Sequence, residues 1–158
     1  MRRKTEPHHK KASLEARPGT YALLLSSASD ARIRVGRLGG MRVQPGYYVY
    51  VGSAFGPGGV RARVSHHLRD SPRHHWHIDY LRPHASVEEL WLCYDRERRE
   101  HSWARLLSSM PGVSVPMLGF GSSDCGCEAH LLFFKSDAMR DRIRDVLSAQ
   151  GASAAGVG

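Results

Sequence analysis

"GYYVYVGSAFGPGGVRARVSHHLR", residues 46–69, changes its hydrophobic period in the middle, and this change indicates the fold class. Residues 46–53 are aromatic and β-branched side chains bounded by glycine, a pattern typical of a buried strand. From Val60 the apolar residues recur at every fourth position, through Val64 and Leu68, as on one face of a helix. The stretch therefore predicts a strand that is followed directly by a helix.

The neighbouring segments predict a small, mainly antiparallel sheet. Residues 19–27, "GTYALLLSS", are another short apolar run between turn residues. Residues 31–46 alternate polar and apolar side chains around a Gly-Gly pair, which predicts an extra hairpin at the sheet edge. Residues 86–94 and 130–134 predict further strands. We therefore expect an α/β (α+β) fold with a sheet of three or more strands flanked by helices.

Three more segments predict the flanking helices. Residues 76–81, "WHIDYL", are short and end before a proline, whereas residues 97–109 end at a Pro-Gly pair. Residues 136–150 carry an apolar stripe, and Ser136 at their start is a typical N-cap residue.

Composition and charge predict one soluble domain. The first 17 residues are basic and almost free of apolar side chains, so residues 1–17 are expected to be a disordered arm. Residues 18–150 are expected to form a single domain, and residues 151–158 a flexible tail. No apolar run approaches the ~20 residues that span a bilayer, and the basic N-terminus lacks a signal-peptide pattern. We expect a cytoplasmic protein without membrane contact.

The excess of positive charge indicates a polyanionic partner. The chain has a net charge of +8 at neutral pH. Basic side chains that neutralise phosphates release condensed counterions and so favour nucleic-acid binding. Nucleic acid is the first candidate, although the same charge also suits anionic lipid or ribosomal RNA.

Helical geometry marks three candidate site residues. Arg63 and His67 lie one turn apart at the margin of the stripe formed by the first helix, where they either line a cleft or extend from the core edge. Glu100 falls within the apolar arc of residues 97–109. A carboxylate in a buried stripe needs a partner, which is either an arginine or a metal ion.

The ordered motifs resemble the GIY-YIG nuclease superfamily. "GTY" is followed by "YVG" with its serine, then by "VRARVSHH" and a glutamate on a later helix. Residues 46–69, "HWHIDYL" and "GFGSSDCGCEAHL" are similar to the branch that occurs alone or fused to endonuclease-III-type glycosylases. The gap between "GTY" and "YVG" is longer than in typical members.

This resemblance implies roles for individual residues. Tyr21 would activate or position the attacking water and Tyr50 would support it, while Arg63 would stabilise the phosphate charge and His67 would aid proton movement. Glu100 would bind one Mg²⁺ or Mn²⁺ ion, with Glu97 as a competing ligand. The residues expected to contact DNA are Ser53, Arg61, His66 and Arg69. A tyrosine near pKa 10 would need a cation to lower its pKa, and Arg63 and the metal ion are the candidates.

Cysteine and histidine spacing does not favour zinc. Cys125, Cys127 and His130 lie close in sequence, but structural zinc sites usually have two residues between paired cysteines and a second, distant pair. Zinc at this loop is not expected. His75 and Asp79 are four apart, as a structural pair on one helix face would be.

Three functions are consistent with these features, the third being a zinc-stabilised interaction domain. The first is a divalent-metal-dependent endonuclease that cleaves phosphodiester bonds in structured, branched or damaged DNA. The alternative is a non-catalytic nucleic-acid-binding module that is accessory to DNA repair.

Overall fold

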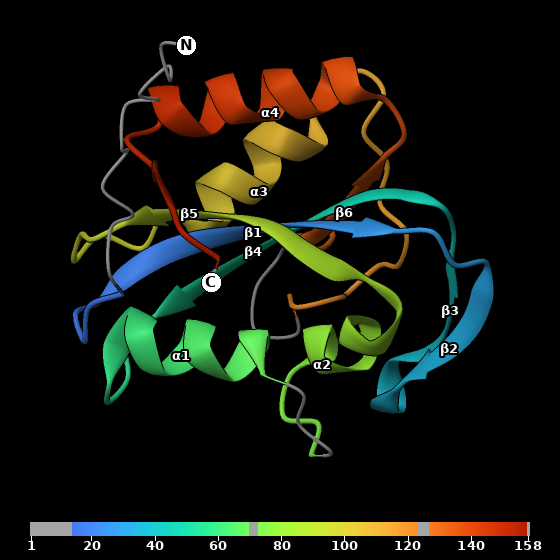
Figure 1. Ribbon diagram of the computed structural model, residues 1–158, viewed down its shortest axis with the longest axis horizontal. Coiled ribbons are helices and arrows are strands. Elements are labelled where there is room, and N and C mark those ends of the chain that lie inside the picture. Colours follow the sequence, from blue (N-terminus) through green and yellow to red (C-terminus); the bar gives the residue numbers. More distant parts are fainter. Residues whose placement is uncertain (1–13, 70–72, 123–126, 158) are drawn as a thin grey trace, which may run out of the picture.

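A central antiparallel sheet carries the fold in the computed structural model, which describes residues 14–69, 73–122 and 127–157. The described strands follow the order β6-β4-β1-β5-β7, with bounds Leu131–Phe134, Gly46–Ala54, Gly19–Ser27, Ser86–Cys93 and Ser153–Ala155. Helices α1 (Gly59–Leu68) and α2 (His77–Leu81) cover one face of this sheet, and α3 (Glu100–Ser108) and α4 (Asp137–Ala149) cover the other (Figure 1). The α+β fold predicted from sequence is confirmed.

The apolar side chains of the central strands point alternately to the two faces of the sheet and form one hydrophobic core on each face. Tyr21 and Leu23 of β1 pack with Val60 and Val64 of α1. Leu24, the next residue along β1, packs on the opposite face of the sheet, with α3 and α4. Successive side chains of a strand point to opposite faces, so both faces of β1 are buried. At ~25 cal/mol per Å² of apolar surface removed from water, burial of this kind is the main driving force for folding.

The predicted helices are present, and two of them differ from the prediction at one end. Ser136 caps α4, because its hydroxyl accepts a hydrogen bond from the Met139 backbone N–H at 3.1 Å. The short helix α2 continues through a 3-10 turn, Arg82–His84, so the proline lies within that turn. Helix α3 starts at Glu100 rather than at residue 97.

The predicted extra hairpin exists, but it does not extend the main sheet. Among the described strands, β2 (Ala31–Val35) and β3 (Gly39–Val43) pair only with each other. They form a separate two-stranded sheet and are joined by a 3-10 turn, Gly36–Leu38. Figure 1 shows this hairpin curling away from the end of the central sheet towards α2. Its apolar residues, among them Met41, join the core on the α1 side.

Both predicted terminal segments contain ordered contacts. The Glu15 carbonyl accepts a hydrogen bond from the Arg61 N–H, and the Arg17 carbonyl accepts one from the Val60 N–H. Both N–H groups lie in the first turn of α1, where a helix provides no acceptor of its own. The rest of the expected arm, residues 1–13, lies outside the described residues. In the expected flexible tail, Ser153–Ala155 form β7 against β5. Strand pairing satisfies backbone groups that the sequence pattern did not mark.

Among the described residues, no helix has both the length and the apolar composition needed to cross a membrane.

Candidate active site

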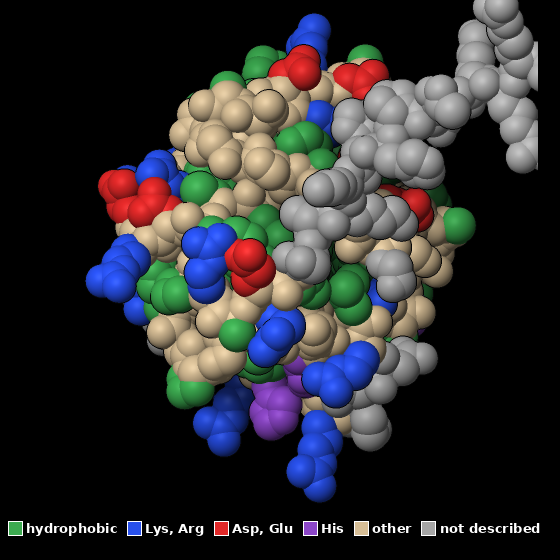
Figure 2. Space-filling model, turned by 60° about the vertical axis from the view of Figure 1, so that its left-hand side comes forward, with side chains coloured by type: hydrophobic (Ala, Val, Ile, Leu, Met, Phe, Trp, Pro, Cys, Tyr) green, Lys and Arg blue, Asp and Glu red, His purple; other side chains and the backbone are tan. Residues whose placement is uncertain are grey.

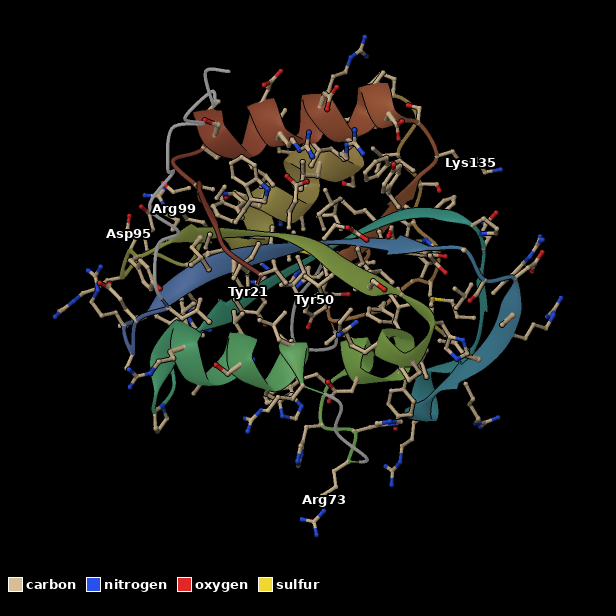
Figure 3. The ribbon with its side chains drawn as sticks, in the orientation of Figure 1. Tyr21, Tyr50, Arg73, Asp95, Arg99 and Lys135 are labelled. Carbon is tan, nitrogen blue, oxygen red and sulfur yellow. The ribbon has the colours of Figure 1, made fainter. Side chains whose placement is uncertain are left out.

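One pocket of about 520 Å³ gathers most of the residues selected from the sequence. Its lining includes Tyr21, Tyr50, Ser53, Arg63 and Glu100. The pocket lies on the α1 side of the sheet, where Figure 3 shows the two labelled tyrosines. Residues from two strands and two helices, separated by as much as half of the chain, therefore meet at one place.

Strand register places Tyr21 opposite the glycine of "YVG". Tyr21 pairs directly with Gly52, and Leu23 pairs with Tyr50, so both tyrosines point to the same face of neighbouring strands. Their ring centroids lie 6.4 Å apart. A Cβ atom at Gly52 would overlap the Tyr21 hydroxyl. The glycine of "YVG" is thus needed to leave room for the tyrosine of "GTY".

His67 is the hydrogen-bonding partner of Tyr21. The Tyr21 hydroxyl lies 2.7 Å from Nε2 of His67, and both side chains are fully buried. His67 therefore lies inside the core rather than at its margin. Its other ring nitrogen, Nδ1, lies 3.9 Å from a carboxylate oxygen of Asp79.

Asp79 is a buried carboxylate that joins the helices α1 and α2. Its Oδ2 accepts hydrogen bonds from the backbone N–H groups of His75 and Trp76, at 2.8 and 3.0 Å. The same oxygen lies 3.1 Å from Nε2 of His66. The predicted contact between His75 and Asp79 thus exists, but through the His75 backbone. Sequence reasoning did not connect Asp79 to His67, because the two residues belong to different helices.

Burial determines the protonation of this network. Burial raises the pKa of Tyr21 well above 10.0, the neighbouring Tyr50 adds to this effect, and Arg63 offsets only part of it. Burial also raises the pKa of Tyr50. Arg63 lowers the tyrosine pKa as expected, but the loss of solvation raises it by more, so the net shift is upward.

The pKa values of His67 and Asp79 are both lowered, in contrast to those of the two tyrosines. Burial lowers the pKa of His67 below 6.5, although Asp79 acts against this shift. For Asp79, burial favours the neutral acid, but the groups around its carboxylate, His67 first and then the Trp76 and His75 backbone, hold its pKa well below 3.8. At neutral pH the ground state is a neutral tyrosine, a neutral imidazole and a carboxylate.

Arg63 is positioned for contact with an anion at the pocket wall. Its guanidinium lies 4.3 Å from the centroid of the Trp76 ring, and its Nη1 donates to the Ser53 carbonyl at 3.4 Å. Arg63 and Trp76 also line an adjoining hollow of about 640 Å³. This second hollow contains two of the residues expected to contact DNA, His66 and Arg69.

The remaining residues expected to contact DNA have different environments. Arg61 is exposed on α1, and Arg69 is exposed directly after the end of this helix. His66 is partly buried, with its Nε2 against Asp79, and the Ser53 carbonyl is engaged by Arg63. The two arginines are thus the ones presented directly to solvent.

Glu100, rather than Glu97, borders the pocket. The Glu100 side chain is 14% exposed, and its carboxylate oxygens lie 3.7 Å from His101 Nε2 and 4.0 Å from His130 Nδ1. Glu97 is largely exposed and pairs with Arg99 at 3.2 Å. Among the described residues, Glu100 is therefore the better placed of the two to bind a metal ion in the pocket.

The "HWHIDYL" segment helps to form the pocket wall. The backbone N–H of Gly121 donates to Nδ1 of His77 at 2.8 Å, and burial lowers the pKa of His77, which keeps this acceptor neutral. Gly121 has φ +70, and a Cβ atom there would lie 3.0 Å from the Tyr50 ring. A glycine is thus required where the loop passes the tyrosine.

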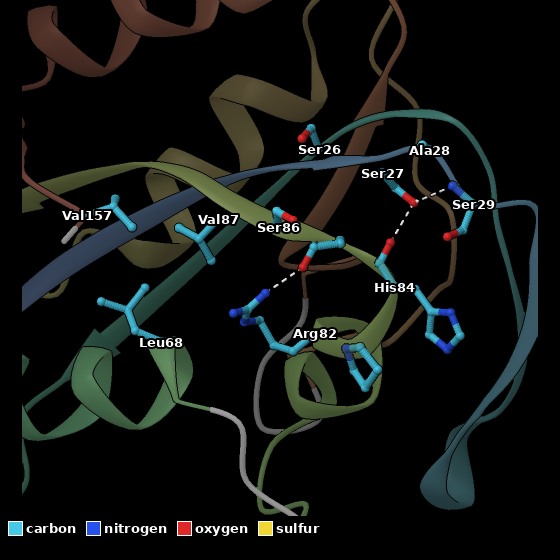
Figure 4. A pocket seen from close by; sticks show the side chains of 12 residues that line it. Ser26, Ser27, Ala28, Ser29, Leu68, Arg82, His84, Ser86, Val87 and Val157 are labelled. Atoms are coloured by element: carbon cyan, nitrogen blue, oxygen red, sulfur yellow. Dashed lines mark hydrogen bonds between the residues drawn. The ribbon is translucent and has the colours of Figure 1, made fainter.

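A larger pocket lies at the opposite end of β1 but lacks this chemistry. It has a volume of about 690 Å³ and lies beside Arg82, Ser27 and His84 (Figure 4). Arg82 donates to the carbonyls of His67 and Ala85, and Ser27 donates to the His84 carbonyl at 2.7 Å. These hydrogen bonds connect α1, the segment after α2 and the sheet, and we therefore assign these polar groups a structural role.

Comparison with known proteins gives one result at the family level. A search of curated proteins and a search of solved structures gave no match. A family model described as "Domain of unknown function DUF123" matches residues 20–152. This range contains every candidate site residue. The chain therefore belongs to the DUF123 family, a family of GIY-YIG-like domains.

Proposed function

We propose that this protein is a divalent-metal-dependent endonuclease that cleaves phosphodiester bonds in structured or damaged DNA. The observation that carries the proposal is the convergence of Tyr21, Tyr50, Arg63 and Glu100 on one pocket. Hydroxyl, guanidinium and carboxylate groups are those needed to orient water, bind a phosphate and hold a metal ion. The motif blocks further suggest the branch found alone or fused to endonuclease-III-type glycosylases, which favours damaged DNA as substrate.

The surface around the pocket supports a nucleic-acid substrate. Figure 2 shows blue Lys and Arg side chains together with purple histidines at the bottom of one face, the side of the sheet on which α1 lies. The adjoining hollow extends this basic surface past Arg63 and Arg69. A strand held there by phosphate contacts would bring a phosphodiester to the pocket, with Arg63 as a bidentate partner.

The buried network provides a path for one proton. Water attacks phosphorus, the bond to the leaving oxygen breaks, and that oxygen takes a proton from solvent. The proton of the attacking water passes to the Tyr21 oxygen. At the same time the Tyr21 proton passes to Nε2 of His67, which lies 2.7 Å away. This exchange avoids a free tyrosinate, which the raised pKa of Tyr21 disfavours. The Asp79 carboxylate stabilises the resulting imidazolium.

Glu100 fits the role of a metal ligand. Its carboxylate oxygens lie 3.7 and 4.0 Å from the imidazoles of His101 and His130, beyond hydrogen-bonding distance, and the residue lines the pocket. A Mg²⁺ or Mn²⁺ ion bound there would act as a Lewis acid on a phosphate oxygen. A single carboxylate suits Mg²⁺, which retains several water ligands.

A cleavage assay tests the proposal. Purified protein is incubated with labelled hairpins, flaps, abasic duplexes and single strands, with Mg²⁺ or Mn²⁺. Tyr21→Phe, Arg63→Ala and Glu100→Ala should each lose cleavage. Tyr47→Phe and Arg105→Ala, which lie outside the pocket lining, should retain it. Cleavage that is equal in all variants would exclude the assignment. Salt-sensitive binding without product in any variant would instead support the alternative, a binding module.

A further inference from the structure

We propose that His101, Cys127 and His130 bind one zinc ion at a site next to the candidate active pocket. Each of these residues offers one ligand atom, and the three atoms all lie within 4.8 Å of one another. His101 is in the first turn of α3, whereas Cys127 and His130 precede β6. The residues are thus brought together by the fold.

The spacing of the ligand atoms is close to that of a tetrahedral zinc site. Zinc binds cysteine sulfur at about 2.3 Å and histidine nitrogen at about 2.0–2.1 Å, which places the two ligand atoms about 3.5 Å apart at the tetrahedral angle. The Cys127 sulfur lies 3.4 Å from Nδ1 of His101. The His130 ligand atom lies within 4.8 Å of both of these atoms, so zinc would draw it closer to them.

The donor atoms select the class of metal. One thiolate and two imidazoles favour zinc and related transition ions over Mg²⁺ or Mn²⁺, which prefer oxygen ligands. Zinc at this position therefore differs from the ion proposed for the pocket side of Glu100. Because zinc binding can be measured without DNA, this inference stands or falls independently of the nuclease assignment.

Glu100 lies next to the ring nitrogen of His101 that would face away from the zinc ion. If Nδ1 of His101 faces the ion, its Nε2 faces Glu100 Oε1 at 3.7 Å. A carboxylate at the remote nitrogen of a metal-binding histidine fixes the tautomer and orientation of the ring. Glu100 would thus connect the zinc site to the pocket, because it lines the pocket itself.

The zinc ion would hold the pocket wall in place. The backbone N–H of His130 donates to the Phe120 carbonyl at 2.8 Å, and the carbonyl of His130 accepts from Val51 of β4. His130 and Gly121 both line the pocket. An ion shared by His130 and α3 would therefore fix this loop relative to Tyr50 and Glu100. Sequence spacing did not reveal the site because His101 lies on a distant helix.

Metal analysis of untagged full-length protein tests the inference. Wild-type protein is expected to contain about one zinc per chain, and cobalt(II) substitution should produce a thiolate-to-metal charge-transfer band. Cys127→Ser should abolish this band and weaken zinc binding by at least about 10-fold. Cys93→Ser is the matched control, because Cys93 lies on β5 and outside the cluster, and it should retain both.

A second variant guards against loss of folding. The His101 side chain is 40% exposed, so His101→Asn should fold normally by circular dichroism and still lose zinc affinity. Wild-type protein without zinc and without a cobalt band on titration would overturn the proposal. Unchanged zinc content in folded Cys127→Ser or His101→Asn would overturn it as well.

Discussion

The hydroxyl of Tyr21 lies 2.7 Å from Nε2 of His67 inside the core, and neither side chain is exposed to solvent. Because burial raises the pKa of Tyr21 and lowers that of His67, the tyrosine is the donor and the imidazole is the acceptor. Nδ1 of His67 then carries the ring hydrogen and faces Asp79. A proton that passed from Tyr21 to His67 would therefore place positive charge 3.9 Å from the Asp79 carboxylate.

Removal of the Tyr21 hydroxyl should affect both activity and stability. Tyr21→Phe should reduce cleavage by about 10²- to 10⁴-fold, the usual contribution of general acid–base catalysis. It should also lower the free energy of unfolding by about 1–3 kcal/mol, because Nε2 of His67 loses its buried partner. Single-turnover cleavage and urea unfolding measure the two effects. Unchanged cleavage in the variant would contradict the proton path.

Cleavage should depend on the protonation of His67. Since the imidazole must be neutral to accept the Tyr21 proton, and burial lowers its pKa below 6.5, activity should fall only at pH values below 6.5. The pH profile of kcat/KM reports this group in the free enzyme. His67→Gln should lose the acid limb together with most of the activity. A limb with its midpoint above 6.5 would show that another group controls the reaction.

Asp79 should stabilise the fold in a pH-dependent manner. Its pKa is lowered from 3.8 in the folded protein, so the unfolded chain binds more protons and stability rises with pH. The contribution is complete above pH 3.8 and is lost as the pH falls through the folded pKa. Asp79→Asn should therefore lower the free energy of unfolding at neutral pH by about 1–3 kcal/mol, the cost of losing charged hydrogen bonds.

Denaturant titrations at several pH values measure this effect. The difference between wild type and Asp79→Asn should shrink as the pH falls below 3.8. Asp30→Asn is the control, because Asp30 forms an exposed pair with Arg42, and such pairs contribute little. A constant difference at every pH would indicate that Asp79 acts through packing alone.

The glycine opposite Tyr21 should not tolerate a side chain. Gly52→Ala should lower the free energy of unfolding by about 1–3 kcal/mol, as overpacked core positions do, because the new methyl group would overlap the Tyr21 hydroxyl. The hydrogen bond from Tyr21 to His67 should also be displaced, with loss of cleavage. Thermal unfolding and the cleavage assay measure both.

Gly40→Ala provides the matched control in another strand. A Cβ atom at Gly40 would meet only the Ile33 carbonyl, at 3.8 Å, and its φ is not positive. This variant should leave stability and cleavage close to those of wild type. Equal effects of the two substitutions would show that Gly52 matters for backbone freedom and not for space.

Local pattern was sufficient to predict most secondary structure. A few neighbouring residues predict each of three features: strand β4 from its aromatic and β-branched run, helix α1 from its four-residue period, and the start of α4 from Ser136. Strand β7 was missed, because Ser153–Ala155 become a strand only by pairing with β5. The hairpin was predicted, but its separation from the main sheet depends on its packing near α2.

The sequence by itself determined which residues carry the candidate chemistry, since Tyr21, Tyr50, Arg63 and Glu100 stand in recognisable motifs in a fixed order. Only the tertiary structure decided how they are connected. Asp79 reaches His67, and His101 reaches Cys127, across different elements. The direction of each pKa shift was also decided there, because desolvation depends on what covers a side chain and not on its neighbours in the chain.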